Sequence, residues 1–184
     1  MNPEPTRPRA RARKSAAPAG AEPVLRVRTV RASDMAAVIA LDATVTGLHK
    51  AAYWQRVFKR YGNYGQGQRQ FLVATLDEQV CGFVIGEVRD WEFGAPPCGW
   101  VFAIDVMPSA RQLGIGARML ADLVARFRRE GVHTLRTMTS SSNSLLQSFF
   151  RSQGMRAGHL LPLEMDLSAY PLEGRGVDDE ERAA

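Results

Sequence analysis

Alternating apolar and polar residues predict strands at several places along the chain. The stretch VLRVRTVR, which begins at Val24, alternates apolar and basic side chains as a half-buried strand does. The apolar runs QFLVATL and VCGFVIGEV are joined by DEQ, so residues 70–88 are expected to form an antiparallel hairpin. Three later runs are each expected to form one more strand: WVFAIDV (100–106), HTLRTMT (133–139) and GHLLPLEMDL (158–167).

Apolar residues at helical spacing predict four helices between these strands. Two follow the first strand, one starting at Met35 and one in KAAYWQRVFKRY (50–61). A third carries an apolar stripe over 119–127 and ends at about Glu130, and the fourth lies in NSLLQSFFRSQG (143–154). The expected order is strand, two helices, three strands, helix, strand, helix, strand.

Length and composition allow one folded domain with two polar ends. The chain has 184 residues, of which 45% are hydrophobic, enough for one core. Residues 1–23 hold five Lys or Arg, two Glu and no large apolar side chain after Met1, which predicts a disordered basic arm. Residues 171–184 are expected to be an acidic flexible tail, which leaves 24–170 as the domain. No run approaches the roughly 18–20 apolar residues of a membrane span, so a soluble protein is expected.

The net charge and the number of cysteines limit which kinds of partner and metal site are expected. A pI near 9.7 favours acidic partners such as a phosphorylated ligand or nucleic acid. The basic run RPRARARK has no interleaved aromatic residues, so specific nucleic-acid binding is not expected. Cys81 and Cys98 are too few for a disulfide framework, and no residues have metal-ligand spacing. We expect a cytoplasmic protein that holds no metal and contacts no membrane.

The stretch RQLGIGA, residues 111–117, lies between the expected strand 100–106 and the third helix. A glycine-rich turn that opens a helix points several N–H groups at one spot, where the helix dipole adds positive charge. Gly114 and Gly116 would let a pyrophosphate approach the backbone, and Arg111 can add a charged donor. The motif alone fits equally a turn that needs glycine for its geometry. The dinucleotide-binding fingerprint G-x-G-x-x-G and the P-loop signature G-K-[ST] are both missing here.

Two motifs together resemble the GNAT superfamily of acyl-CoA-dependent N-acetyltransferases. The pattern [QR]-x-x-G-x-[GA] of that family is matched by Arg111, Gly114 and Gly116. A second block of the family has an Asn, a helix ending in an aromatic residue, and then Gly and an apolar residue. It is matched by Asn143, Phe150, Gly154 and Met155.

The resemblance covers roughly residues 24–169 and implies both a fold and an activity. The fold would be α/β (α+β), with a mixed, mostly antiparallel central sheet flanked by helices. The activity would use acetyl-CoA as cosubstrate and an amine as acceptor, without a metal. A homodimer is left open.

The resemblance also implies which residues would hold coenzyme A. Backbone N–H groups of the turn would cradle its pyrophosphate, with Arg111 beside them; the turn consists of Gln112, Leu113, Gly114, Ile115, Gly116 and Ala117. The backbone of Val106 would pair with the pantetheine arm like an added strand, and the N–H of Ile104 would stabilise the oxyanion of the thioester. Asn143 would bond the pantetheine or phosphate arm, or it caps the helix that follows. Phe150 would contact the cosubstrate.

The proton-transfer residues depart from the family pattern. Acyl transfer needs a neutral amine and therefore a base. Relatives often carry a glutamate base at the positions of Trp100 and Met138 and a tyrosine acid at the position of Phe150, and none of these three side chains can transfer a proton. The replacement candidates for the base are Asp105, Glu87 and Glu92.

Two functions follow from these residues. One is an N-acetyltransferase that moves an acetyl group from acetyl-CoA, in a ternary complex, to a primary amine of a small molecule or of a protein lysine or amino terminus. The other is a catalytically degenerate module that binds acyl-CoA for regulation, suggested by the missing base and acid. Binding of acetyl-CoA without turnover on any acceptor would distinguish the second from the first.

Overall fold

The computed structural model describes residues 23–62 and 67–168, which fall into two compact units that divide after Ser141. Apart from Pro23, the predicted basic arm lies outside the described residues, and so does the acidic tail. The elements of the first unit are β1 (Leu25–Thr29), η1 (Ala32–Asp34), α1 (Met35–Thr46), α2 (Ala51–Tyr61), β2 (Arg69–Leu76), β3 (Gln79–Arg89), η2 (Glu92–Gly94), β4 (Cys98–Val106), η3 (Pro108–Ala110), α3 (Ile115–Arg129) and β5 (Leu135–Thr137). The second unit contains α4 (Ser144–Ser152).

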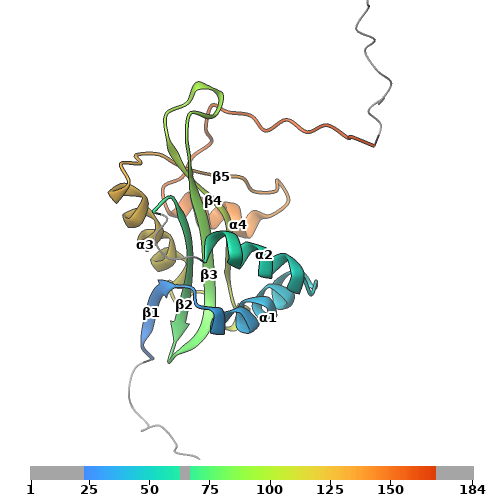
Figure 1. Cartoon of the computed structure of the whole chain (residues 1–184), viewed down its shortest axis with the longest axis vertical. Coiled ribbons are helices and arrows are strands. Elements are labelled where there is room, and N and C mark those ends of the chain that lie inside the picture. Colours follow the sequence, from blue (N-terminus) through green and yellow to red (C-terminus); the bar gives the residue numbers. More distant parts are fainter. Residues whose placement is uncertain (1–22, 63–66, 169–184) are drawn as a thin grey trace, which may run out of the picture. The chain divides into compact units, whose positions relative to one another are not determined.

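The described part of the first unit forms a five-stranded sheet in the order β1-β2-β3-β4-β5 (Figure 1). Neighbouring strands are antiparallel except β4 and β5, which run parallel. The predicted hairpin is confirmed: β2 and β3 are joined through Asp77 and Glu78, whose φ angles of 49° and 66° suit a tight two-residue turn. A mixed, mostly antiparallel sheet flanked by helices confirms the expected fold class.

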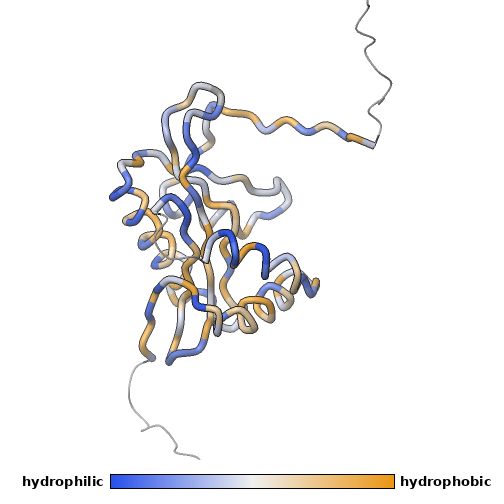
Figure 2. The backbone as a smooth tube through the Cα atoms, in the orientation of Figure 1, coloured by the Kyte–Doolittle hydropathy of each residue, from blue (hydrophilic) through white to orange (hydrophobic). Residues whose placement is uncertain are grey.

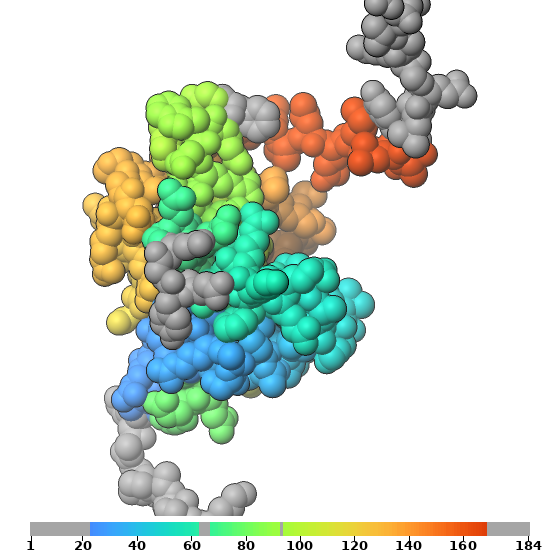
Figure 3. All heavy atoms as spheres, in the orientation of Figure 1, coloured from blue at the N-terminus to red at the C-terminus, as the bar shows by residue number. Residues whose placement is uncertain are grey.

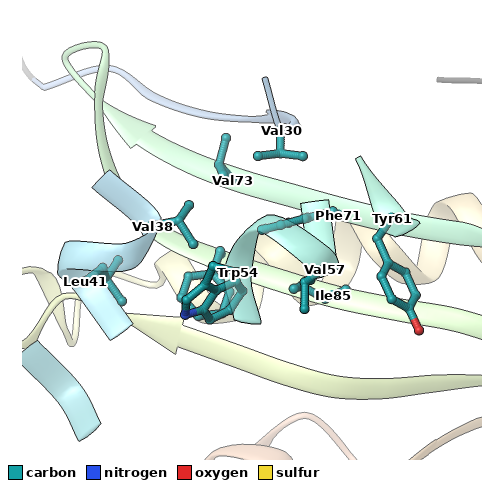
Figure 4. Close-up of a cluster of buried hydrophobic side chains, with 10 residues drawn as sticks. Val30, Val38, Leu41, Trp54, Val57, Tyr61, Phe71, Val73 and Ile85 are labelled. Carbon is teal, nitrogen blue, oxygen red and sulfur yellow. The ribbon is translucent and has the colours of Figure 1, made fainter. Parts of the chain in front are cut away.

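One face of the sheet carries α1 and α2, which also contact each other (Figure 3). Alternate residues of β2 and β3 point to this face, because side chains of a strand alternate between its two sides. Their apolar cluster with the two helices is drawn in Figure 4 and consists of Val30, Val38, Leu41, Trp54, Val57, Tyr61, Phe71, Val73, Phe83 and Ile85. The ring centroids of Trp54 and Phe83 lie 4.9 Å apart. Tyr61 closes one end of the cluster, and its hydroxyl points away from the other labelled side chains (Figure 4).

The opposite face of the sheet is covered by α3, which buries Met119, Leu123 and Phe127. Gly86 of β3 permits this close approach. A Cβ atom at Gly86 would lie 2.5 Å from the carbonyl oxygen of Trp100 and 3.1 Å from the Phe127 ring. Both β4 and α3 would then have to move away from β3. The helix predicted from the apolar stripe is therefore confirmed, and it forms the helical layer on this second face of the sheet.

One prediction, which falls in the second unit, is wrong. The strand predicted over 158–167 is wrong, because no residue there belongs to a strand of the described chain. The apolar positions of the pattern are largely exposed: Leu161, Leu163, Met165 and Leu167. The alternation is real and is visible in Figure 2, but a strand also needs a neighbour that accepts and donates its backbone hydrogen bonds. Pro162 additionally removes one donor from this run.

Candidate active site

An unpaired edge of β4 lies at the centre of the candidate site. Within the described residues β5 pairs only with Gly99–Val101, so the rest of β4, from Phe102 to Val106, has no strand on that side. The register with β3 shifts at Phe102, which is an extra residue in β4. After this bulge the amide of Met107 donates to the Cys81 carbonyl of β3 at 2.8 Å. Because successive amides of a strand point to opposite edges, those of Ile104 and Val106 point to the unpaired edge.

The turn 111–117 follows directly on this edge and opens α3. Gly114 has a φ of 72° and ends the turn, and the first hydrogen bond of the helix runs from the Arg118 amide to the Gly114 carbonyl at 3.0 Å. The amides of Ile115, Gly116 and Ala117 therefore precede the first bond of the helix and remain available, at its positive end.

Residues 111–113 form the outer side of the same turn. Gln112 also has a positive φ, of 68°, and the Leu113 side chain is exposed. The Arg111 guanidinium donates from Nε to the Val106 carbonyl at 3.2 Å. The arginine thus joins the turn to the end of β4, where the predicted Val106 lies.

Asp105 stands between the two edge amides, with its side chain on the α1–α2 face of the sheet. Burial and, to a lesser extent, the nearby carboxylate of Asp42 raise the pKa of its carboxyl to about 6, against the opposing charges of Arg111 and Lys50. A carboxylate with this pKa is ionised at neutral pH and is a better proton acceptor than an ordinary aspartate. Of the three predicted bases, this one lies beside the unpaired edge of β4.

Asp42, which was not predicted as a site residue, lies close enough to Asp105 to raise its pKa. It is buried in α1, where its two carboxylate oxygens accept hydrogen bonds from Lys50 Nζ at 3.0 Å and Trp54 Nε1 at 2.8 Å. A buried carboxylate of this kind needs such donors to offset its lost hydration. From the sequence, the spacing of Asp42, Lys50 and Trp54 indicates only helices. Their side chains meet because α1 packs against α2.

Glu87 and Glu92 lie elsewhere. In the β3–β4 register Glu87 is opposite Trp100, whereas Asp105 is opposite Phe83, at the other end of β4. The Glu87 carboxylate already accepts hydrogen bonds from the Tyr61 hydroxyl at 2.9 Å and from Arg89 Nε at 3.2 Å. Burial raises the pKa of Tyr61 to about 12, and the hydrogen bond to Glu87 contributes.

Glu92 is in η2, with its side chain 40% exposed and 3.8 Å from Arg89. The structure therefore groups the three predicted bases into two separate places, Asp105 in one and the two glutamates in the other.

Asn143 and Phe150 belong to the second unit. The Asn143 side chain accepts a hydrogen bond from the Leu146 amide at 3.0 Å and caps α4, which is the structural role predicted as its alternative. Phe150 is buried, with its ring 5.2 Å from that of Phe149.

The described residues contain no group of three His, Cys, Asp or Glu side chains that could hold a metal ion. In the same part of the chain, no helix is both long and apolar enough to cross a membrane. Cys81 and Cys98 are buried free thiols, and burial raises the pKa of Cys81.

Comparison with known proteins gives a consistent result. The model of the acetyltransferase (GNAT) family matches residues 37–155. An L-2,4-diaminobutyric acid acetyltransferase from Nocardia farcinica (strain IFM 10152) is 30% identical over 112 residues, which are 61% of this chain and 53% of that protein. The chain thus spans about half the length of this curated relative.

Two solved structures share the fold. The aminoglycoside N-acetyltransferase AAC(6')-Iy in complex with CoA matches with a TM-score of 0.70 and 17% identity, over 80% of this chain and 97% of that one. A transcriptional regulator from Bacillus halodurans C-125 matches with a TM-score of 0.67 and 18% identity, over 78% and 99%. Since the family model covers more than half of the sequence, the chain belongs to the GNAT family of acetyltransferases.

Proposed function

We propose that this acetyltransferase moves an acetyl group from acetyl-CoA to a primary amine in a ternary complex. The proposal depends above all on one arrangement: the free amides of β4 and of the α3 N-terminus adjoin each other, with Asp105 between the edge amides. Phosphate, amide and carbonyl groups of the cosubstrate each have a complementary group along this path.

The turn 111–117 would hold the pyrophosphate. Amides at the start of a 15-residue helix combine available donors with the positive end of the helix dipole. Arg111 would add a charged donor, exchanging its bond to the Val106 carbonyl for one to phosphate. The Val106 amide and carbonyl, both directed to the unpaired edge, would then pair with the amides of the pantetheine arm.

The Ile104 amide would donate to the carbonyl oxygen of the thioester, where negative charge develops during attack. Asp105 would take the proton that the attacking amine loses, directly or through one water molecule. The carbon–nitrogen bond forms, the carbon–sulfur bond breaks, and the thiolate of coenzyme A leaves with the electron pair. Because Phe150 stands at the position of the family tyrosine, the thiolate would take its proton from solvent.

The acceptor is proposed to be a small-molecule amine. The curated relative is named for L-2,4-diaminobutyric acid and several solved structures for aminoglycosides, so both amine classes belong in the assay. A protein lysine or amino terminus is the remaining acceptor class. The cytoplasmic location and the homodimer stay predictions.

The experiment is transfer of labelled acetyl from acetyl-CoA to a panel of amines and to a cell lysate separated into protein and small molecules. Gly114→Glu is the test variant and Gly131→Glu its matched control. The two glycines have φ angles of 72° and 77°, and a Cβ atom at either would meet nothing within 4 Å. Both variants therefore carry the same backbone cost, about 1–2 kcal/mol.

Only Gly114→Glu places a negative charge among the amides proposed to hold phosphate. We expect it to lose coenzyme A binding and transfer while Gly131→Glu keeps both. Unchanged affinity for coenzyme A in a folded Gly114→Glu protein would refute the phosphate site. Intact acetyl-CoA binding with no labelled amine in any fraction would instead favour the regulatory module.

A further inference from the structure

An exposed aromatic side chain lies on β4 beside the candidate active site. Phe102 is the extra residue of the β4 bulge, so it has no partner in the register with β3. It is 38% exposed, whereas Phe71 and Phe83, the other phenylalanines of the sheet, are 0% and 1% exposed. A bulge can turn a side chain toward a functional site, because the extra residue departs from the alternation of the strand. The bulge thus leaves a large apolar ring open to a ligand.

Tyr61 of α2 holds the Phe102 ring on the α1–α2 face of the sheet. The two ring centroids lie 5.0 Å apart, with an angle of 53° between the ring planes. Tyr61 is itself fixed, because it is buried and its hydroxyl donates to the Glu87 carboxylate at 2.9 Å. The Glu87 carboxylate therefore supports the Phe102 ring through Tyr61. A ring that is held in place before a ligand arrives loses less conformational entropy on binding.

Phe102 and Asp105 lie on the same face of β4. In the register with β3, Asp105 is opposite Phe83, which belongs to the apolar cluster beneath α1 and α2. Ala103 is opposite Ile85 of the same cluster, and its side chain is a single methyl group. Phe102 and Asp105 are three positions apart, so their backbones are separated by roughly 10 Å. On this face of β4, only the methyl group of Ala103 stands between the ring and the proposed base.

We propose that the Phe102 ring packs against the carbon chain of the amine acceptor, so that the enzyme favours primary amines with an apolar chain. This inference depends on the proposed function, because it assigns the substrate class for the same site. With its nitrogen at Asp105, an acceptor several carbon atoms long would extend along β4 to the ring. Each methylene group that packs on the ring removes apolar surface from water, which is favourable. A short amine would reach Asp105 but not Phe102.

The test measures acetyl transfer from acetyl-CoA to straight-chain primary amines from propylamine to hexylamine. These amines have nearly the same pKa, close to that of a lysine ammonium, so the series reports chain length and not protonation. Initial rates give kcat and KM for each amine. Titration calorimetry on protein saturated with coenzyme A gives the affinity of each amine without turnover. The series also includes 1,5-diaminopentane, which carries an ammonium group in place of the terminal methyl group of hexylamine.

Phe102→Gln and Phe102→Ala are the test variants, and Phe102→Leu is their control, because it keeps an apolar side chain at the same position. Thermal unfolding shows that each variant is folded, as expected for a residue that is 38% exposed. In the native protein kcat/KM should rise by about two- to fourfold for each added methylene group, mainly through a lower KM. The rise should disappear in both test variants and persist in large part in Phe102→Leu.

Each result decides the proposal. A flat series in the native protein, or the same rise in Phe102→Gln or Phe102→Ala, would overturn it while leaving the transferase intact. A preference for 1,5-diaminopentane over hexylamine would also overturn it, since the ring would then hold a cation and not a hydrocarbon chain. If no amine is acetylated, the proposed function fails, yet calorimetry still decides the role of the ring. Affinity that rises with chain length only while residue 102 is apolar supports the proposal, and equal affinity or no binding refutes it.

Discussion

Replacing Asp105 by Asn should slow acetyl transfer and stabilise the fold. In the folded protein the pKa of this carboxyl is raised from 3.8 to about 6, so its ionised form is disfavoured by burial and by Asp42. Two pKa units correspond to about 3 kcal/mol, which solvent screening of a partly exposed group reduces to about 1–2 kcal/mol. The neutral amide avoids this cost but cannot accept a proton, and removing a general base lowers the rate about 10²–10⁴-fold.

The pH dependence separates the two effects. Below pH 3.8 the Asp105 carboxyl is protonated in both folded and unfolded protein, so urea unfolding should give native and variant similar stability. As pH rises from 3.8 to about 6 the native protein loses stability relative to Asp105→Asn, and above that range the difference should stay constant. In kcat/KM the native enzyme should show an acid limb near pH 6, well separated from the limb of the acceptor amine near 10.

A suitable control for Asp105→Asn is Asp122→Asn, which removes a carboxylate from the outer side of α3, where it pairs with Arg118 at 3.5 Å. It should change neither the acid limb nor the pH dependence of stability. An acid limb that persists in Asp105→Asn would refute the assignment of the base. A stability difference that does not grow between pH 4 and 7 would refute the raised pKa.

Three further perturbations test the surroundings of the site. Asp42→Asn removes a charge that raises the Asp105 pKa, so the acid limb of kcat/KM should move to lower pH, as a rate profile would show. Arg28→Met leaves the buried Asp34 without the hydrogen bonds of 2.7 and 2.9 Å that lower its pKa. Denaturant unfolding at pH 7 should show that the free energy of unfolding falls by about 3–5 kcal/mol. This difference from the native protein should shrink as pH falls below 3.8, where the Asp34 carboxyl becomes protonated. Gly86→Ala would press a methyl group onto the neighbouring strand, and thermal unfolding should show a loss of about 1–3 kcal/mol.

The order of elements was predictable because it depends on local pattern. The hairpin 70–88 and the helix after Gly114 each follow from a period of apolar residues with a turn at its end. The run 158–167 has a pattern just as clear, yet no strand forms there in the described chain. Periodicity indicates which face of a strand would be buried. It does not indicate whether another strand lies alongside to form the backbone hydrogen bonds, because that depends on the tertiary fold.

The candidate site was predictable where it consists of backbone. The turn 111–117 and the end of β4 are adjacent in sequence, so their amides had to be close together. The surroundings of Asp105 were not predictable, because Asp42 reaches it from α1, more than 60 residues earlier in the chain. The contacts of Arg60, Arg69 and Arg89 with Glu87 were not predictable for the same reason, because these arginines come from three elements that only the sheet and α2 bring together.

The carboxylates beside β4 favour one orientation of the acceptor. Asp105 and Asp42 place negative charge at the proposed site of transfer. An amine acceptor would lie with its ammonium group toward these carboxylates. The ammonium pKa near 10 exceeds that of Asp105 by about four units, so full proton transfer before attack would cost about 5 kcal/mol. An ammonium nitrogen has no lone pair for attack, so the proposed mechanism requires that Asp105 take the proton before the carbon–nitrogen bond forms. A cost of this size fits within the activation barrier of about 13–17 kcal/mol that corresponds to a kcat of roughly 1–10³ s⁻¹.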